Sequence, residues 1–261
     1  MQFKPRINIK NLKKNTITNT QAIVKSLTPG LGTSIPIILF EEIFTNLHYN
    51  ENILNFELIE LSIFLSFLFY NYDRFLDSLE KTNKNEKDIL IEKNKNYIIF
   101  ILAYCFLEIN KILYQNEINY IFSIPLSTCF IYKDLKFFLG IYKPVFIAFM
   151  WTGACIFIPS ILHDNSFAII QDYLCYIPCL LTMFSTSNIA DIKDIEEDTL
   201  ANINTIPVKY GIDKTKLISL LSLFFSSILF LNHPNFNNNN NLDLFFEFQN
   251  LIIFVSILFG L

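Results

Sequence analysis

The amino-acid sequence predicts an all-α, multi-pass membrane protein, and three observations indicate this class. Apolar residues make up 52% of the 261 residues and charged residues only 17%, whereas a soluble domain carries about 25% charged residues. Mean hydropathy is +0.38. The apolar residues, 28 Phe among them, gather in blocks of roughly 20 residues, about the length of a helix that crosses a bilayer. The expected surroundings are therefore a lipid bilayer.

We count eight such blocks, with nine helices possible, and expect each block to form a transmembrane helix. The first block is interrupted by Pro29, Gly30, Gly32 and Pro36. Such breaks are tolerated in membrane helices where neighbouring helices cover the freed backbone groups. The blocks lie at about residues 22–44, 53–72, 97–110, 113–131, 141–162, 167–187, 216–231 and 244–261.

The segments between the blocks alternate in charge, which predicts the orientation of the chain. Charged loops follow the second, fourth and sixth blocks, at residues 73–96, 132–143 and 188–215. The other loops are short or neutral, and of the 20 Lys and Arg residues only Lys111 falls in them. By the positive-inside rule the charged loops face the cytoplasm or the plastid stroma. We expect an integral protein of a bacterial inner membrane or a plastid membrane.

The N-terminal segment, residues 1–20, is polar and basic, and residues 21–261 are expected to form one transmembrane domain. The segment contains one Arg, four Lys and no acidic residue, and no apolar stretch of a cleaved signal peptide follows directly. The rule for membrane orientation places it on the same side as the charged loops. Because the formal net charge is −4, nucleic acid is not expected as a partner.

The cysteines and histidines do not predict a functional site of their own. All five Cys lie inside apolar blocks, where a free thiol is usually a small buried apolar group. His48, His163 and His233 fall in three separate loops, so a histidine-based metal site is not expected. Trp151, inside the fifth block, is expected to be a packing or membrane-interface residue.

Two clusters of aspartates stand where an apolar block meets a charged loop. Asp73 and Asp77 are four residues apart and share one helix face. Asp191, Asp194 and Asp198 fall within about 60° of one another on a helix that turns 100° per residue. Like charges so placed destabilise a helix unless a cation balances them. Mg²⁺ prefers oxygen ligands and commonly combines one or two carboxylates with substrate phosphate, so the clusters predict a magnesium-diphosphate site.

The acids of the loop between residues 80 and 95 are expected to be solvated instead. Glu80, Glu86, Asp88 and Glu92 stand there among lysines, whereas the two aspartate clusters lie at the boundary of an apolar block.

The second cluster resembles a motif of the UbiA superfamily of intramembrane prenyltransferases. Asp191-Ile-Lys-Asp194-Ile-Glu-Glu-Asp198, followed by Thr205-Ile-Pro207-Val208 and Gly211, is similar to the family pattern DIxDIxGDxxxGxxTLPVxxG. Asp73-Arg74-Phe-Leu-Asp77 resembles the latter half of the family's first motif, NDxxDRxxD. Tyr132-Lys-Asp-Leu-Lys136 is similar to a YxxxK element of some members, and Lys25 stands where many members have a basic residue.

The chain departs from the family pattern at several positions. Phe69 and Tyr70 align with the leading Asn-Asp of the first motif, next to Asn71. In the second motif, Glu197 and Asn202 each replace a Gly. The chain is therefore similar to a divergent member of the family.

The resemblance implies a helical bundle around a central cavity and a magnesium-dependent transfer of an isoprenyl group. The donor would be a polyprenyl diphosphate and the acceptor a hydrophobic, often aromatic, molecule. The resemblance implies that the carboxylates hold Mg²⁺ against the diphosphate, that the basic residues bind its oxygens, and that the polar and aromatic residues contact the substrate. The carboxylates that would hold Mg²⁺ are Asp73, Asp77, Asp191, Asp194 and Asp198. The basic residues that would bind the diphosphate are Arg74, Lys136, Lys25 and Lys193. The residues that would contact the substrate are Asn71, Tyr70, Tyr132 and Asn188.

Three other functions remain open at the level of the sequence. A terpene cyclase or lyase of the same fold needs the same ionisation of a diphosphate but no separate acceptor. A transporter with an acidic cation site is a second alternative, since acids in membrane proteins often mark ion pathways. An inactive membrane scaffold is a third, because the first motif is only partly present.

Overall fold

The computed structural model describes residues 34–49, 56–80, 84, 86–116, 130–132, 134–164 and 172–237, and within these ranges the chain is helical, with no strand. The all-α prediction is therefore confirmed for this part of the chain. The α-helices are α2 (Ser34–Tyr49), α3 (Phe56–Glu80), α4 (Glu86–Lys93), α5 (Lys95–Gln115), α7 (Lys143–Thr152), α8 (Ile158–Asp164), α9 (Tyr173–Lys193), α10 (Ile195–Leu200), α11 (Ile206–Tyr210) and α12 (Ile212–Leu231). Shorter elements are the 3₁₀ helices η1 (Gly140–Tyr142) and η4 (Pro234–Asn237) and the π-helical turn η2 (Gly153–Phe157).

Three helices in the described part of the chain are long and apolar enough to cross a membrane. They are α5, the helix over Asp134–Ser160 that contains α7, and α12. The helices α3 and α9 cover the described part of the predicted blocks 53–72 and 167–187 from Phe56 and Tyr173 onward, and both continue past these blocks into the aspartate clusters. Most of the block at 113–131, the block at 244–261, and residues 1–33 with the N-terminal segment and Lys25 lie outside the described residues. The count of eight spans stays a prediction.

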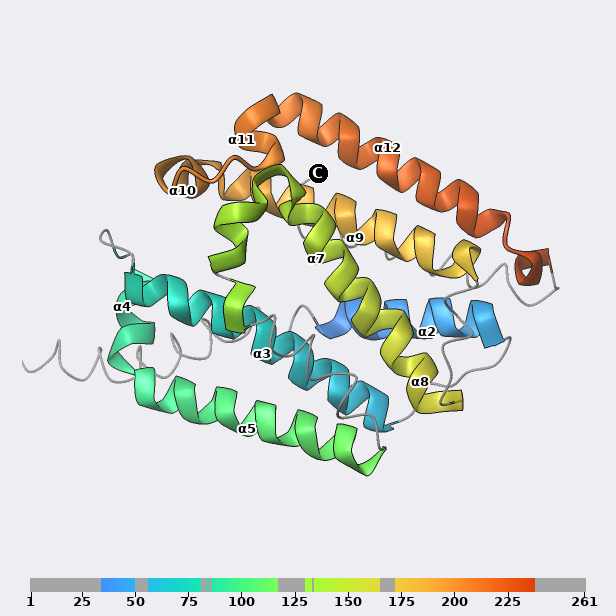
Figure 1. The fold of residues 1–261 in the computed structure, drawn as a ribbon, viewed down its shortest axis with the longest axis horizontal. Coiled ribbons are helices and arrows are strands. Elements are labelled where there is room, and N and C mark those ends of the chain that lie inside the picture. The colour runs from blue at the N-terminus through green and yellow to red at the C-terminus, as the bar shows by residue number, and fades with distance from the viewer. Residues whose placement is uncertain are drawn as a thin grey trace, which may run out of the picture.

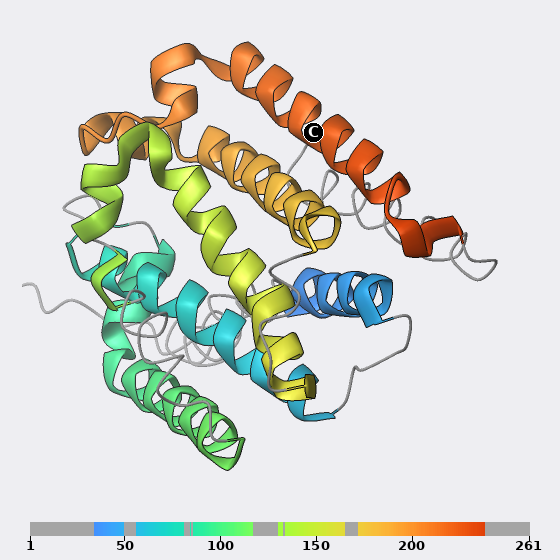
Figure 2. The same cartoon turned by 45° about the vertical axis from the view of Figure 1, so that its right-hand side comes forward.

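The bundle consists of two antiparallel helix pairs joined by a crossing helix. Figure 1 shows α3 beside α5 and α9 beside α12, with α7 running between the two pairs. The helix α2 packs against α3, η2 and α9. The short helices α4 and α10 lie at the same end of the bundle in both views (Figures 1 and 2), so the charged loops that contain them share one end.

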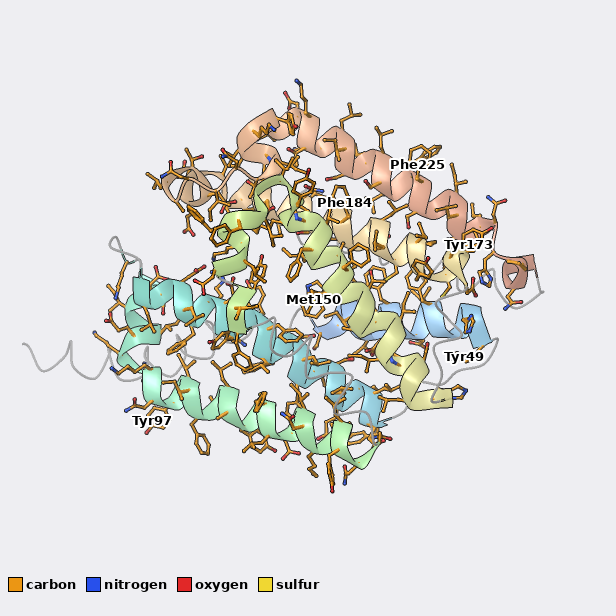
Figure 3. The ribbon with its side chains drawn as sticks, in the orientation of Figure 1. Tyr49, Tyr97, Met150, Tyr173, Phe184 and Phe225 are labelled. Carbon is orange, nitrogen blue, oxygen red and sulfur yellow. The ribbon has the colours of Figure 1, made fainter. Side chains whose placement is uncertain are left out.

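Helix α5 shows why these segments are helices and what surrounds them. Its buried residues Ile98, Leu102, Cys105 and Ile109 recur at intervals of four, three and four, which places them on one face toward α3. The other face is also apolar, and Tyr97 is 72% exposed. On the opposite side of the bundle Phe225 of α12 is 54% exposed and projects outward (Figure 3). Large apolar groups on outer faces indicate a lipid environment.

The four described cysteines agree with their expected role. Cys105, Cys155, Cys175 and Cys179 are free and buried. Cys155, Cys175 and Cys179 lie in the core between α2, α7 and α9, together with Phe40 and Phe44. Cys129 lies outside the described residues.

The three histidines lie at the end of the bundle opposite α4 and α10, but His48 and His163 are in the last turns of α2 and α8, so the expectation that all three fall in loops is wrong. His48 Nδ1 lies 2.7 Å and His233 Nε2 lies 3.0 Å from the same oxygen of Asp172. His163 packs its ring 4.6 Å from that of Tyr49, which is labelled at this end in Figure 3. The Nδ1 of His233 accepts the backbone N–H of Asn235, so its Nε2 carries the proton and donates to Asp172. The cluster fastens together the ends of α2, α9 and η4.

A left-handed residue, Gly140, redirects the chain between residues 134–139 and α7. Its φ is +49°, a conformation that glycine adopts without strain. A Cβ at this position would lie 3.4 Å from the carbonyl oxygen of Asn204, which is close contact. Glycine is therefore required at this turn mainly because φ is positive, and less because a Cβ would lack space.

We expect Gly140→Ala to destabilise the bundle by about 1–2 kcal/mol, the usual cost of a left-handed conformation for a residue with a Cβ. A fall in the apparent Tm of the detergent-purified protein would measure this effect. Gly153→Ala is the matched control, because Gly153 has no positive φ and an added Cβ there meets no atom within 4 Å. An equal fall in Tm for both variants would contradict the assignment of strain to Gly140.

Candidate functional site

A cavity of about 440 Å³ opens at the charged end of the bundle, between α3, α7 and α9. Its size lies in the range of small-molecule sites, about 300–1,000 Å³. One part of its wall is charged and the other is aromatic or apolar. The charged residues are Asp73, Arg74, Asp77, Asp88, Lys193, Asp194 and Glu197, and the others are Phe69, Tyr70, Tyr132, Phe146, Ile147, Met150, Trp151 and Ala190.

The first aspartate cluster stands on the last turns of α3 and is paired with Lys136. Since α3 continues to Glu80, Asp73 and Asp77 remain on one helix face, although the apolar block ends at residue 72. The Nζ of Lys136 donates to Asp77 Oδ1 at 2.9 Å and lies 3.6 Å from Asp73 Oδ1. Burial raises the pKa of Asp73 and the charge of Asp77 adds to the rise, while Lys136 and Lys143 act in the opposite direction.

The second cluster is paired with Lys143, the first residue of α7. The Nζ of Lys143 donates to Asp191 Oδ1 at 2.7 Å and lies 3.7 Å from Asp198 Oδ2. All three side chains are at most 9% exposed, so these charges are largely removed from water. Burial raises the pKa of Asp191 to about 6, against the effect of Lys143, and it also raises the pKa of Asp198.

Asp194 does not share this environment, which corrects the expectation of a continuous acidic stripe. The helix α9 ends at Lys193, and α10 begins at Ile195 after Asp194. Asp194 is consequently exposed, although it borders the cavity. Asp191 and Asp198 still meet, because the break in the helix turns α10 so that both carboxylates reach Lys143.

The two acid pairs belong to one electrostatic site. The charge of Lys143 acts on Asp73 of the first pair, and that of Lys136 acts on Asp198 of the second. Tyr132 lies among the four carboxylates, and burial together with their charges holds the pKa of its phenol well above the usual value. The turn at Gly140 makes this possible, since it lets Lys136 and Lys143 approach different acid pairs from one short segment.

Two asparagines in α3 and α9 have matching environments. The side-chain amides of Asn71 and Asn188 each donate to the carbonyl oxygen four residues earlier, at 3.0 Å. Their Oδ1 atoms are buried and have no hydrogen-bond partner among the described residues. The same holds for Asp191 Oδ2 and Asp198 Oδ2. Buried polar atoms in this state typically bind a water molecule or an ion.

Arg74 forms the rim of the cavity together with Tyr70. Its guanidinium carbon lies 5.3 Å from the centre of the Tyr70 ring, in the geometry of a cation–π contact. Asp194 and Glu197 act on Arg74 electrostatically from the other side of the cavity. Lys193 borders the same opening. The rim therefore offers cations next to acids, which suits an anionic ligand that carries its own metal.

The predicted site residues thus fall into three groups. Tyr70, Asp73, Arg74, Asp77, Tyr132, Lys193 and Asp194 line the cavity. Asn71, Lys136, Asn188, Asp191 and Asp198 lie close to it through the ion pairs and helices just described, without being among its lining residues. Lys25 lies outside the described residues.

Several residues of the site were not predicted. Asp88 is buried and lines the cavity, so the expectation that all acids of residues 80–95 are solvated is wrong for this residue. Trp151 also lines the cavity, in addition to its expected packing role. Lys143 is the third residue of the site that was not predicted. The sequence feature that could have identified it is a single lysine directly before Pro144 at the edge of a long apolar block.

The donor set fits magnesium that is bound jointly with a phosphate ligand. Among the described residues, no group of three or more His, Cys, Asp or Glu is arranged to hold a metal ion by itself. Each acid pair does offer two carboxylates, and buried Oδ1 atoms of Asn71 and Asn188 supply further oxygens. Mg²⁺ in such sites takes one or two carboxylates and completes its shell with water and substrate phosphate.

Comparisons of the chain with protein-family models, with curated proteins and with solved structures give no match.

Proposed function

We propose that this chain is a divergent UbiA-type prenyltransferase that moves an isoprenyl group from a polyprenyl diphosphate to a hydrophobic acceptor, within the membrane. The observation that carries the proposal is a cavity lined by the acid pair Asp73 and Asp77, with the second pair, Asp191 and Asp198, close to it and with aromatic and apolar side chains on the rest of its wall. A charged end and an apolar continuation in one cavity suit a substrate with an anionic head and a hydrocarbon tail.

In the proposed reaction the charged end holds the diphosphate. Asp73, Asp77, Asp191 and Asp198 would hold Mg²⁺, with Asp194 at the rim, and the metal when bound would neutralise the departing diphosphate. Lys136, Lys143 and Arg74 are the cations nearest to these acids. Arginine suits a bidentate contact with phosphate oxygens, and lysine acts as a point charge.

The aromatic wall acts on the hydrocarbon part of the substrate. Cleavage of the C–O bond leaves the electron pair on the diphosphate and forms an allylic cation. The faces of Tyr70, Phe69 and Trp151 can stabilise this cation, and the apolar wall excludes water from it. The acceptor then forms a new bond to the allylic carbon and loses a proton. The products are prenylated acceptor, diphosphate and a proton.

The location that follows is a bacterial inner membrane or a plastid membrane, with the acid pairs on the cytoplasmic or stromal side. The positive-inside rule supports this orientation, since the lysine-rich loops are on the side of the acid pairs. The acceptor class that the aromatic wall favours is an aromatic ring with a hydrophobic body.

The test is the release of diphosphate by the purified protein in detergent. Geranyl, farnesyl and geranylgeranyl diphosphate would each be supplied with Mg²⁺, with and without a panel of aromatic acceptors. Release that requires an acceptor, together with a prenylated product, supports the proposal. Release with a hydrocarbon product and no acceptor identifies a cyclase or lyase instead. No release under any condition, or cation flux in proteoliposomes, contradicts the proposal.

We expect the kcat/KM of this reaction to fall below about pH 6, because the pKa of Asp191 in the free protein is raised to about 6 and only its carboxylate can bind a cation. Folding stability should change in the opposite direction. A carboxyl with a folded-state pKa above its unfolded value of 3.8 favours the folded state most at low pH, and this contribution is lost as the pH rises through 6. Parallel measurements of kcat/KM and Tm against pH separate the two effects. An acidic limb that follows Tm would contradict the assignment to Asp191.

A further inference from the structure

We propose that Phe69 and Trp151 close the apolar end of the cavity and limit the prenyl donor to a short chain, of two to three isoprene units. The inference rests on the proposed function and adds the length of the substrate to it. The ring centres of the two residues lie 5.8 Å apart with their planes at 71°, an edge-to-face contact between α3 and α7.

These two residues are the deepest cavity-lining residues that the structure describes on their helices. On α3 the lining residues run from Asp77 and Asp73 inward to Phe69, and on α7 from Phe146 inward to Trp151. The next positions in the same direction, Leu65 of α3 and Ala154 of η2, are buried in the core against which both aromatic rings pack. The cavity therefore ends at the contact between the two rings.

The depth of the apolar part follows from the helix geometry. The charged groups farthest from the aromatic contact are Asp77, eight residues after Phe69 on α3, and Lys143, eight residues before Trp151 on α7. At 1.5 Å per residue, these two groups lie about 12 Å along the helix from the aromatic contact, and Asp73 lies about 6 Å from it. A diphosphate held near Asp77 and Lys143 therefore leaves at most about 12 Å before the two rings.

This depth suits a short hydrocarbon chain. An isoprene unit adds four carbon–carbon bonds along the chain, one of them a double bond, and spans about 5 Å when extended. A diphosphate held at the acid pairs leaves space for two units in extended form and for a third when the chain bends. A fourth unit would meet the rings of Phe69 and Trp151.

Trp151 is also the residue whose removal would open the most space. It packs against the core between α3 and α5 and against the core between α2, α7 and α9. Met150 lies next to it in the middle of the bundle (Figure 3) and can change rotamer more easily than an aromatic ring. A smaller side chain at position 151 is therefore expected to lengthen the cavity along α7.

The experiment measures binding rather than turnover. Geranyl, farnesyl and geranylgeranyl S-thiolodiphosphates, which ionise poorly, would be titrated with Mg²⁺ into the full-length protein in detergent by calorimetry. The unchanged protein should prefer the geranyl or farnesyl analogue. In Trp151→Ala and Phe69→Ala the affinity for the geranylgeranyl analogue relative to the geranyl analogue should rise about tenfold or more, since each added isoprene unit buries several carbon atoms.

The matched control is Phe149→Ala, because Phe149 is on the same helix, is 60% exposed and is not among the lining residues. The affinity of the Phe149→Ala variant for the geranylgeranyl analogue relative to the geranyl analogue should stay unchanged. Trp151→Leu and Phe69→Leu repeat the test with smaller losses of packing if the alanine variants do not fold. Binding with an unchanged length preference in all cavity variants overturns the inference and leaves the proposed function standing. No binding of any analogue by the unchanged protein overturns both.

Discussion

Asp191→Asn is expected to reduce the release of diphosphate by about 100-fold or more while the protein stays folded. The change keeps the size of the side chain and removes the charge that a cation requires. Replacement of a group that only supports a metal ligand typically lowers metal affinity or activity by about 10–100-fold. Loss of the ligand itself should therefore lower the rate of diphosphate release by about 100-fold or more. Lys143 keeps a partner in this variant, because Asp198 Oδ2 lies 3.7 Å from its Nζ. Initial rates at saturating Mg²⁺ and the apparent Tm measure the two effects.

Two further variants complete this experiment. Asp77→Asn tests the other acid pair and should give a loss of similar size. Asp213→Asn, in the first turn of α12, replaces an exposed carboxylate that does not line the cavity and should leave the rate unchanged. Full activity of both Asp191→Asn and Asp77→Asn would remove the acid pairs from the mechanism.

Lys143→Met is expected to destabilise the folded protein by about 3–5 kcal/mol, which is typical when one member of a buried ion pair is removed. The methionine fills similar volume but leaves Asp191 and Asp198 without their cation in a buried site. The pKa of Asp191 should rise further, because Lys143 acts to lower it. The acidic limb of kcat/KM should therefore move to higher pH. Thermal unfolding in detergent and the pH profile measure these changes.

The double variant Lys143→Met with Asp191→Asn tests the cause of this loss. It should recover part of the stability, since one of the two uncompensated carboxylates is then absent. Lys214→Met, which replaces an exposed lysine of α12, is the control and should change Tm little. A Lys143→Met protein as stable as the unchanged one would mean that the carboxylates are neutral or hydrated in the folded state.

The helical fold and the end at which the acids gather could be predicted from the sequence, for local reasons. Apolar blocks of membrane-spanning length specify helices, and the lysines on alternate loops specify which ends lie together. Asp73 and Asp77 needed only helical spacing to share a face. Much of the predicted loop at 73–96 is helical instead, because α3 continues to Glu80 after its apolar part has ended and α4 covers Glu86–Lys93.

The contacts across the site could not be predicted in this way, because they depend on tertiary geometry. Lys143 reaches Asp191 only through the left-handed turn at Gly140, and Asp88 becomes buried only when α4 folds back at the end of α3. Asn202 is a further example. It stands at one of the positions where the family pattern has glycine, and with φ at +56° it adopts the left-handed conformation that asparagine tolerates better than most residues.

The lysines that occupy both acid pairs give the site a built-in competitor. A cation that binds Asp191 and Asp198 must displace the ammonium group of Lys143, which stays attached to α7 nearby. An anion that attracts the freed lysine therefore strengthens the binding of the cation, and thermodynamic linkage requires the reverse effect to be equal. Under the proposed function, metal and diphosphate donor are thus expected to bind with positive cooperativity.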